Sequence, residues 1–428
     1  MSTAPTTDRV IQTTVLPNGL HVISEEMPHV KSVSVGVWIR SGSRREVGPE
    51  SGLSHFIEHM VFKGTESRSA EDIARVMDSL GGSLDAFTGK ELVSFNAKVL
   101  DEHLPVAFDV LSDMVLHPAF RDGDIEREKG VILEELKMEA DNPEYLVHET
   151  FSSHFWKNHP LGRPILGTRS TIRGFHRRML HHYYRHVYTP ANILITAAGR
   201  VPHQLLVDMA ADRFGKLPPG PQSPGQDPPC PNASLVLRNR TALEQVHLIL
   251  GVPALAVADE RRFAAYLLNT LLGGSMSSRL FQNIREQRGL AYAVFSELSS
   301  YRDSGALSVY AGTSRQALKE VISLVLQEFH RFKDEPVGEE ELLRGKNHLK
   351  GSLLLSLEST SNRMGNLARQ FIYFGRFWGL DEIVEAIDAV TAAAIRDAAC
   401  DFFRPERLAL TAIGPLNGLR IHRRELAC

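Results

Sequence analysis

The stretch Ser51-Gly-Leu-Ser-His-Phe-Ile-Glu-His-Met-Val-Phe-Lys-Gly64 decides how the rest of this 428-residue chain is interpreted. Its spacing of apolar residues predicts a helix, and residues four apart on a helix share one face. His55 and His59 are therefore expected with Cβ atoms about 6 Å apart, close enough for one metal ion to contact both imidazoles. Glu58 lies on the edge of the same face, where its carboxylate can reach a water molecule on that ion.

The other positions of this helix are mostly apolar, which predicts that it is buried. They are Leu53, Phe56, Ile57, Met60 and Val61. Two histidines and a glutamate inside a buried helix need partners, because an unpaired buried carboxylate costs several kcal/mol. The His-x-x-Glu-His spacing is that of the inverzincin class of zinc peptidases, so a metal ion is one such partner. A structural hydrogen-bond cluster without metal is the alternative.

Length and composition are typical of a soluble globular protein with two or more domains. Apolar residues make up 43% and charged residues 23% of the chain, and the formal net charge of −3 gives no reason to expect nucleic acid or an anionic membrane as a partner. The three scattered cysteines, Cys230, Cys400 and Cys428, fit a reducing compartment. Because the sequence shows neither an export signal nor an apolar run of about 18 residues, we expect the protein in the cytoplasm.

Strands and helices are expected on both sides of the histidine-bearing helix. Apolar runs around the turn Pro17-Asn18-Gly19 predict a hairpin over residues 13–23. Residues 32–39 alternate as a strand, and two further short strands are expected within 83–100. The remaining expectations in this half are helices over 69–80, 104–116 and 121–139 and a strand over 192–198.

The helix expected over 121–139 carries Glu128 and Glu135, which share one face because they are seven residues apart. Glu135 is a candidate metal ligand, since two His and one Glu form a known catalytic zinc set with a fourth position open for water. A second pair, His182 and His186, lacks a Glu within its spacing and leads into a helix end. We interpret that pair as a structural or exposed face.

The two halves of the chain repeat each other. Residues 188–199 (YTPANILITAAG) correspond to residues 403–414 (FRPERLALTAIG), about half the chain apart. Residues 217–231 between the halves contain seven prolines, a composition that excludes a helix or a central strand and favours a semi-rigid linker.

The second half repeats the histidine-bearing helix without its polar residues. Matching Gly273 to Gly64 places a helix over 263–274 in the position of the first one. Its residues Ala264, Leu267 and Leu268 then replace His55, Glu58 and His59. We therefore expect the second half to keep the fold and to lack a metal site. Arg285 and Tyr292 lie in the segment that follows this helix.

Taken together, these residues resemble the pitrilysin/insulinase family of zinc peptidases, and within it the short two-domain members akin to the mitochondrial processing peptidase subunits and their bacterial relatives. The resemblance covers about residues 13–416. It rests on the motif His55 to His59, on Glu135 with Glu128 before it, on the segment Gly81 to Thr88, and on Arg285 and Tyr292.

This resemblance implies an α+β fold of two homologous α/β-roll domains, each a mixed, mostly antiparallel sheet packed with helices. We expect an N-terminal zinc-binding catalytic domain over residues 1–216 and a proline-rich linker over 217–233. A homologous C-terminal domain without metal, carrying Arg285 and Tyr292, is expected over 234–428.

The resemblance also implies roles for individual residues. One Zn²⁺ per chain is bound by His55, His59 and Glu135, although a set of this kind also accepts Mn or Co. Glu58 is the general base that activates a zinc-bound water, and Glu128 orients a ligand. Arg285 holds the substrate backbone, and Tyr292 steadies the carbonyl oxygen as it becomes an oxyanion.

An extended peptide substrate is implied as a strand added to one sheet edge. The receiving residues are Ser83, Leu84, Asp85, Ala86, Phe87 and Thr88. Asp85 departs from the Asn that the family commonly has there, which favours contacts with basic residues.

The implied function is that of a zinc-dependent endopeptidase acting on unfolded peptides or presequence-like segments. Relatives of this length form a chamber from four halves, which implies a homodimer with Arg285 and Tyr292 supplied in trans. Two alternatives are a non-catalytic scaffold or partner subunit of a processing-peptidase-like complex and a zinc hydrolase of small amides.

Overall fold

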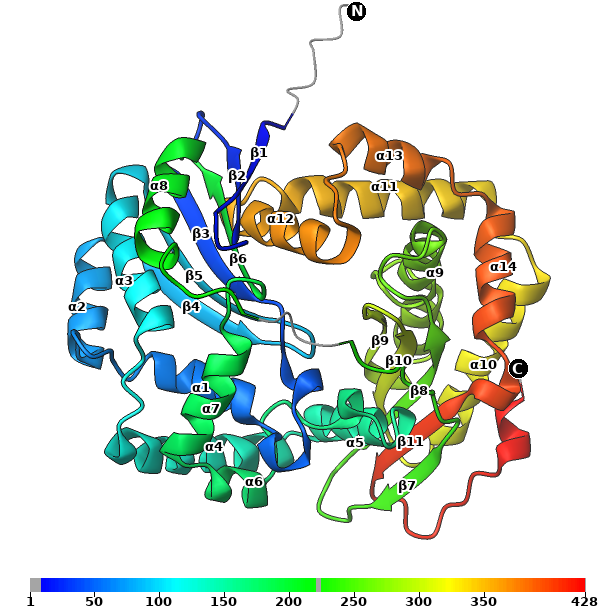
Figure 1. Ribbon diagram of the computed structural model, residues 1–428. Helices are drawn as coiled ribbons and strands as arrows, with labels where there is room; N and C mark the ends of the chain where they lie inside the picture. The colour runs from blue at the N-terminus through cyan, green and yellow to red at the C-terminus, as the bar shows by residue number, and fades with distance from the viewer. Residues whose placement is uncertain (1–8, 221–224, 428) are drawn as a thin grey trace, which may run out of the picture. The chain divides into compact units, whose positions relative to one another are not determined.

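The computed structural model describes residues 9–220 and 225–427 of the chain (Figure 1). It divides into two compact units, each built around one β-sheet. Unit 1 comprises Met1–Leu136, Pro164–Gln226 and Leu354–Gly379, and unit 2 comprises Lys137–Arg163, Asp227–Leu353 and Leu380–Cys428. Each unit therefore includes a segment from the opposite half of the chain.

The sheet of unit 1 has six strands in the order β1-β2-β6-β3-β5-β4. They are β1 (Ile11–Val15), β2 (His21–Glu26), β3 (Ser32–Ile39), β4 (Ser83–Thr88), β5 (Val93–Leu100) and β6 (Ile193–Gly199). β2 and β6 run parallel, and every other neighbouring pair is antiparallel. The turn between β1 and β2 contains Gly19, whose φ of +88° is a conformation that glycine adopts without strain. The predicted hairpin is thus confirmed.

The sheet of unit 2 repeats this topology with one strand fewer. Its order is β7-β11-β8-β10-β9, and only β7 and β11 are parallel among its paired strands. The strands are β7 (Leu235–Asn239), β8 (Val246–Ala254), β9 (Ala291–Ser300), β10 (Gly305–Thr313) and β11 (Ala409–Gly414). Position by position, this order matches β2-β6-β3-β5-β4, which confirms the duplicated, mostly antiparallel α+β fold.

Helices cover both faces of the sheet in unit 1. On one face, Phe56 of α1 (Leu53–Val61) and Phe108 of α3 (Leu104–Leu116) are fully buried in the main core. On the other face, α12 (Thr360–Phe374), drawn in orange in Figure 1, places Met364 beside Trp38 of β3. The remaining helices are α2 (Ala70–Ser79), α4 (Asp122–Asp141), α6 (Arg169–Gly174), α7 (Arg177–Val187) and α8 (His203–Phe214), with α4 continuing into unit 2.

Unit 2 is built in the same way, with α5 (Pro143–Phe155) in the place of α12. Phe151 of α5 packs in a core with Ile249 of β8, and a Cβ added at Gly251 would lie 2.3 Å from its ring. The other helices are α9 (Arg262–Leu272), α10 (Leu318–Asp334), α11 (Glu339–Ser356), α13 (Leu380–Asp388) and α14 (Ala392–Phe402). One face of each sheet is therefore covered by a helix from the opposite half of the chain.

Most of the expected elements agree with these bounds, including the strand over 32–39 and the helix over 104–116. The described residues of the proline-rich stretch form neither helix nor strand, and residues 221–224 lie outside the described part. His182 and His186 are exposed on α7, as expected. The boundaries 1–216, 217–233 and 234–428 divide the chain by homology between its halves and stay a prediction.

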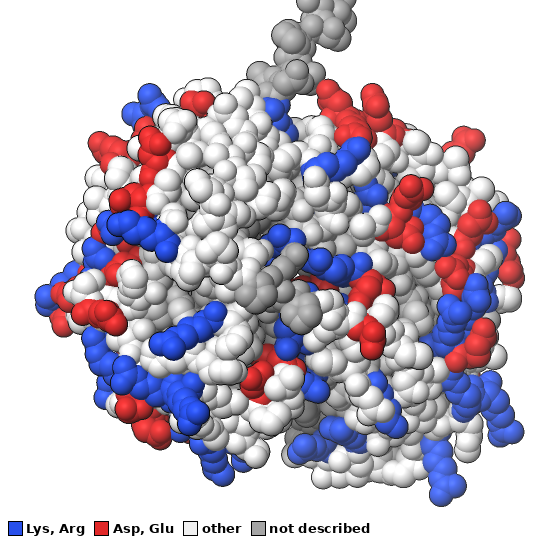
Figure 2. Space-filling model, in the orientation of Figure 1, with Lys and Arg blue, Asp and Glu red and all other residues white. Residues whose placement is uncertain are grey.

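Charge is spread rather than concentrated on the face drawn in Figure 2, where Lys and Arg side chains alternate with Asp and Glu. Within residues 9–220 and 225–427, no helix has the length and apolar character needed to cross a membrane.

Candidate metal centre

The helix α1 is buried, as its apolar pattern predicts. Phe56 and Ile57 are fully buried, and His55 is 8% exposed. Glu58 and His59 are only partly covered, so their polar groups reach the boundary of the core. The helix therefore holds two imidazoles and a carboxylate on a rigid element, with one side facing accessible space.

A buried carboxylate fixes the start of α1. Glu46 is 2% exposed, and its two oxygens accept hydrogen bonds of 2.7 Å from the backbone N–H groups of Gly52 and Ser54. These bonds satisfy two of the N–H groups that a helix leaves free at its first turn. Burial raises the pKa of Glu46 to about 7, although the hydrogen bonds from Ser54 and Gly52 oppose that shift. The hydroxyl of Ser54 also shares a hydrogen bond of 2.8 Å with that of Tyr183 on α7.

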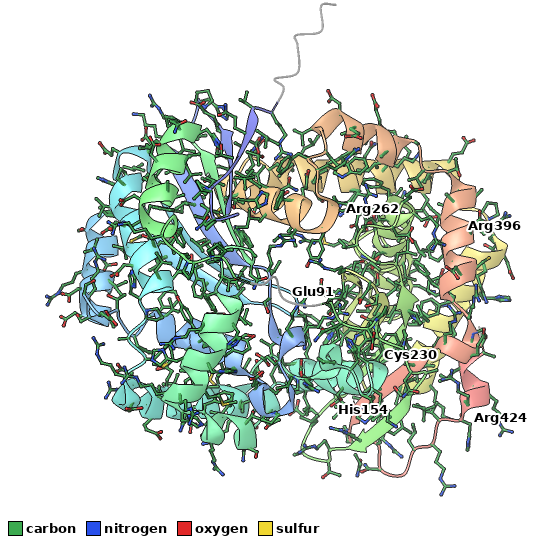
Figure 3. All side chains as sticks on the ribbon, in the orientation of Figure 1. Glu91, His154, Cys230, Arg262, Arg396 and Arg424 are labelled. Atoms are coloured by element: carbon green, nitrogen blue, oxygen red, sulfur yellow. The ribbon has the colours of Figure 1, made fainter. Side chains whose placement is uncertain are left out.

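The loop before α1 is held on the other side by the β4–β5 hairpin. The backbone N–H of Ser43 bonds to the carbonyl of Gly89, and that of Arg44 bonds to the carbonyl of Lys90. The Arg44 guanidinium also pairs with the carboxylate of Glu91, which is labelled in Figure 3, at 2.8 Å. The position of α1 is therefore set at its N-terminus by several independent contacts.

Glu135 of α4 completes a group of three with the two histidines. Its carboxylate oxygens lie 3.9 Å from Nε2 of His55 and 3.8 Å from Nε2 of His59. All three ligand atoms lie within 4.8 Å of one another, and no second such group occurs among residues 9–220 and 225–427. Donor atoms of a tetrahedral zinc site lie about 3.3 Å apart, given bonds of about 2.0 Å. The residues present therefore fit a zinc ion after small side-chain adjustments.

Two further observations support a metal at this position. Oε2 of Glu135 is buried without a hydrogen-bond partner in the described part of the chain, which a metal bond would remedy. Burial and the neighbouring His59 lower the pKa of His55 to about 4. His55 is therefore neutral at pH 7, and its nitrogen lone pair is available to a metal.

Glu128, one buried residue of α4, orients His59. It is 3% exposed, and its Oε1 lies 2.9 Å from Nδ1 of His59. A proton on Nδ1 leaves Nε2 free on the side that faces Glu135. The other oxygen of Glu128 is 2.8 Å from Nζ of Lys63. Burial alone would raise the pKa of Glu128, but the hydrogen bonds from His59 and Lys63 outweigh it and lower that pKa.

Glu58 lies beside the three candidate ligands and is not one of them. The hydroxyl of Thr88, the last residue of β4, donates a hydrogen bond to its Oε2. Burial raises the pKa of Glu58, while Thr88 and His59 lower it and Glu135 raises it. A carboxylate with a raised pKa beside a metal-bound water is suited to accepting a proton.

Comparison with known proteins assigns this arrangement to a family. A family model described as Insulinase (Peptidase family M16) matches residues 21–169, and one described as Peptidase M16 inactive domain matches residues 174–349. The Bacillus subtilis protein named "Uncharacterized zinc protease YmxG" is 40% identical over 398 residues, which cover 93% of this chain and 97% of that protein. The chain belongs to the insulinase family of peptidases.

Other comparisons agree with this assignment and confirm the two-domain type. A Streptomyces coelicolor protein, also named an uncharacterized zinc protease, is 37% identical across 95% of this chain and 90% of its own length. Among solved structures, a protease from Helicobacter pylori is similar with a TM-score of 0.87 at 20% identity, covering 95% of this chain and 99% of that one. A peptidase M16 inactive domain from Pseudomonas fluorescens gives 0.89 at 21%, covering 95% and 98%. These structures show that the fold is shared.

The substrate strand implied by the insulinase family is β4, which forms an edge of the sheet in unit 1. Within residues 9–220 and 225–427 it pairs only with β5, so the backbone groups on its outer side face no described strand of the sheet. Ser83, Asp85 and Phe87 are exposed, while Leu84 and Ala86 pack against the core that contains α1. A free edge next to the metal group suits an added strand.

The two residues that insulinase-family resemblance assigns to the second half lie together in unit 2. Arg285 is part of a short π-helix, Phe281–Glu286, and its guanidinium stacks over the rings of Phe281 at 4.7 Å and Tyr292 at 5.0 Å. Tyr292 is 79% exposed at the start of β9. Short π-helical turns occur often at functional sites. The structure thus places both residues in one accessible cluster.

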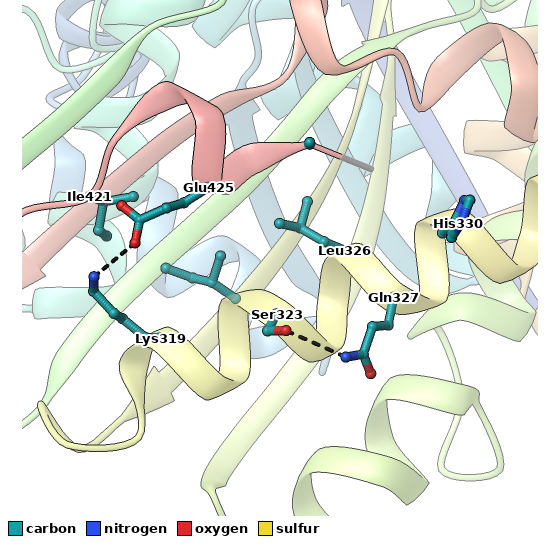
Figure 4. Close-up of a pocket in the computed structure, with 9 residues that line it drawn as sticks. Lys319, Ser323, Leu326, Gln327, His330, Ile421 and Glu425 are labelled. Carbon is teal, nitrogen blue, oxygen red and sulfur yellow. Dashed lines mark hydrogen bonds and ion pairs between the residues drawn. The ribbon is translucent and has the colours of Figure 1, made fainter.

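Elsewhere in unit 2, a groove of about 580 Å³ runs along α10 (Figure 4). Lys319 and Glu425 close one side of it with an ion pair of 2.8 Å, and Ile322, Leu326 and Ile421 line it. Its one lining histidine, His330, pairs with Asp334 at 3.3 Å. No ligand set like that of unit 1 forms there among residues 9–220 and 225–427.

Three contacts of the metal centre cannot be predicted from the sequence alone. They are the cap of α1 by Glu46, the bond from Thr88 to Glu58, and the bond from Lys63 to Glu128. Only Lys63 has a local signal, because it follows His59 by four positions and so shares its helix face. The other two depend on how distant segments approach one another in the fold.

Proposed function

We propose that this protein is a zinc-dependent endopeptidase that hydrolyses peptide bonds in unfolded peptides or presequence-like segments. The observation that carries the proposal is the convergence of His55, His59 and Glu135 on one point, with Glu58 beside it. The zinc-protease names of its relatives support the same reaction class. Peptides, rather than small amides, are the proposed substrates because β4 offers a free strand edge beside this group.

Each residue of the centre has a defined task in this reaction. His55, His59 and Glu135 would hold the zinc ion, which when bound supplies a water of lowered pKa and polarises the scissile carbonyl. Glu58 accepts the proton of that water and passes it to the leaving amine, a role typically worth about 10²–10⁴-fold in rate. Thr88 donates a hydrogen bond to one oxygen of Glu58, and the other oxygen would accept the proton of the water.

Arg285 and Tyr292 complete the proposed mechanism as hydrogen-bond donors. Tyr292 would bond to the substrate carbonyl oxygen as negative charge develops on it, and Arg285 would hold the substrate backbone. The stacking of Arg285 on Tyr292 keeps both groups in one cluster.

Metal analysis combined with peptide mapping tests the proposed function. Wild type and Glu58→Gln are compared for zinc content and for cleavage of a mixed peptide library by mass spectrometry. We expect about one zinc per chain in both proteins, and chelator-sensitive cleavage in wild type only. A wild type without bound metal, or a Glu58→Gln protein with wild-type activity, overturns the proposal.

We further propose a homodimer in which each site uses Arg285 and Tyr292 from the other subunit. The chain carries both sets of residues, so two sites per dimer follow. Mixing Glu58→Gln protein with Tyr292→Phe protein tests this, because one of the two sites in a mixed dimer then has both groups intact. Mixed dimers that are no more active than the parents contradict a shared site.

The non-catalytic alternative predicts a folded protein that cleaves nothing in the same library. The complete ligand set and the base beside it favour the peptidase. The cytoplasmic location and the identity of the metal as zinc stay predictions.

A further inference from the structure

Three side chains form a continuous series that ends at the metal centre. Nζ of Lys63 lies 2.8 Å from Oε2 of Glu128, and Oε1 of Glu128 lies 2.9 Å from Nδ1 of His59. Each carboxylate oxygen therefore has a different nitrogen partner. The orientation of the carboxylate depends on both.

Burial makes the contact with Lys63 more than an ordinary surface ion pair. The side chain of Glu128 is 4% exposed, whereas that of Lys63 is 37% exposed. Water has little access to Oε2 of Glu128, so it cannot easily replace a lost ammonium group, and a buried acceptor without a donor is unfavourable. The carboxylate would then have to turn or shift, and His59 would move with it.

The backbone around Lys63 is held by hydrogen bonds on both sides. The N–H of Lys63 bonds to the carbonyl of Met60 at 3.1 Å, in the turn that ends α1. The carbonyl of the next residue, Gly64, accepts a hydrogen bond of 3.1 Å from Ala119. The contact with Glu128 is thus made from a rigid segment.

We propose that Lys63 is a positioning residue that sets the metal affinity of the centre by holding Glu128 against His59. This inference rests on the proposed metal site and adds to it a residue that contacts neither the ligand atoms nor the substrate. Its action is indirect: Lys63 orients the carboxylate, and the carboxylate fixes the ring and tautomer of His59.

Zinc affinity of the metal-free protein, measured by competition with a chelator, tests the inference without any need for activity. Loss of a residue that orients a ligand typically weakens metal binding about 10–100-fold. We expect such a loss for Glu128→Gln, a loss of about tenfold for Lys63→Met at the low end of that range, and near wild-type affinity for Lys63→Arg. A double variant Lys63→Met/Glu128→Gln is expected to bind no more weakly than Glu128→Gln alone, because both changes act through one carboxylate.

Lys129→Met is the matched control. Lys129 lies on α4 next to Glu128 and makes its own ion pair of 2.7 Å with Glu126, so this variant also removes a lysine ion pair from the same helix. We expect it to leave zinc affinity unchanged. Thermal unfolding of the metal-free proteins shows whether each variant is folded, and Lys63→Gln replaces Lys63→Met if the latter is not.

The outcomes separate this inference from the proposed function. If wild type binds zinc but Lys63→Met binds it equally well, or if the losses from Lys63→Met and Glu128→Gln add fully, the role of Lys63 is refuted and the peptidase proposal stands. If wild type itself binds no zinc, the metal site fails and the inference fails with it. A loss in Lys63→Met that Lys63→Arg restores supports it.

Discussion

The helices α1 and α9 occupy equivalent places in the two units and differ in what they carry. The helix α1 follows β3, and α9 follows β8, the strand that matches β3 in the sheet of unit 2. Each helix packs in the main core of its own unit. His55, Glu58 and His59 of α1 are replaced by Ala264, Leu267 and Leu268, each 209 positions further along the chain. All three residues of α9 are buried and apolar. The fold therefore does not need imidazole or carboxylate groups at these positions, so their presence in α1 points to chemistry rather than stability.

The largest expected effect comes from making α1 resemble α9. In His59→Leu we expect zinc binding and peptide cleavage to be lost, because one ligand and the partner of Glu128 are removed. The metal-free fold should survive, since a leucine occupies the matching position of α9. Zinc content, library cleavage and thermal unfolding measure the three results. A variant that stays active contradicts the assignment of His59 as a ligand.

The reverse change tests the comparison from the side of unit 2. Leu268 is fully buried, so Leu268→His places an unpaired polar ring in an apolar core. We expect a loss of about 2–4 kcal/mol in the free energy of unfolding, from lost apolar burial and an unsatisfied nitrogen. Denaturant titration measures it. Zinc affinity should be unchanged, because the metal centre lies in unit 1. A Leu268→His variant as stable as wild type would show that α9 tolerates a polar residue at this position.

Some features of the fold and of the metal centre can be predicted from the sequence, and others cannot. The strand over 32–39, the helix over 104–116 and the shared helix face of His55 and His59 follow from local periodicity and motif spacing. The approach of Glu135 to these histidines does not follow from spacing, and its role as a ligand is inferred from a known zinc ligand set and from the family resemblance. The packing of α5 and α12 on the sheet of the opposite half cannot be predicted in this way. An amphipathic pattern predicts that one face of a helix is buried, but it does not identify the sheet against which that face packs. For the same reason, the cap that Glu46 provides and the bond from Thr88 to Glu58 require the tertiary structure.

The loops that follow α1 and α9 are both anchored by ion pairs to later helices of the same unit. In unit 1, Arg68 bonds to Asp113 of α3 at 2.6 Å. In unit 2, Arg279 bonds to Glu341 of α11 at 2.8 Å and lies 3.8 Å from Glu328 of α10. Asp113 and Glu328 are buried, whereas Glu341 is only partly covered. Each loop is therefore held by at least one buried carboxylate of its own unit.

A moderate, pH-dependent effect is expected for Asp113→Asn. Burial alone would raise the pKa of Asp113, but hydrogen bonds from Thr65, Ser67 and Arg68 outweigh it and lower that pKa below its usual value. A lowered pKa in the folded state means that the carboxylate stabilises the fold above its unfolded pKa, and that this contribution is lost as the pH falls through the folded pKa. The variant should lose about 2 kcal/mol at pH 7, and the difference from wild type should shrink below about pH 4. Urea unfolding at several pH values measures it, and a difference that is constant with pH contradicts this account.

The smallest expected effect concerns β4 and β9, the edge strands that match each other in the two sheets. Asp85 on β4 and Glu297 on β9 are both exposed acidic residues at a sheet edge. In unit 1, Thr88 at the end of β4 bonds to Glu58 of the metal centre. If a peptide binds along β4, Asp85 attracts a basic side chain beside it with about 0.2–1 kcal/mol, the range of an exposed ion pair. Asp85→Asn should therefore lower the ratio of kcat/KM for Arg-containing over Gln-containing peptides about 1.4- to fivefold at low salt, and less at high salt. Glu297→Gln is the matched control and should leave that ratio unchanged. Equal ratios in wild type and Asp85→Asn would mean that β4 binds substrate through its backbone alone, and a shift caused by Glu297→Gln would mean that β9 takes part in selecting the peptide.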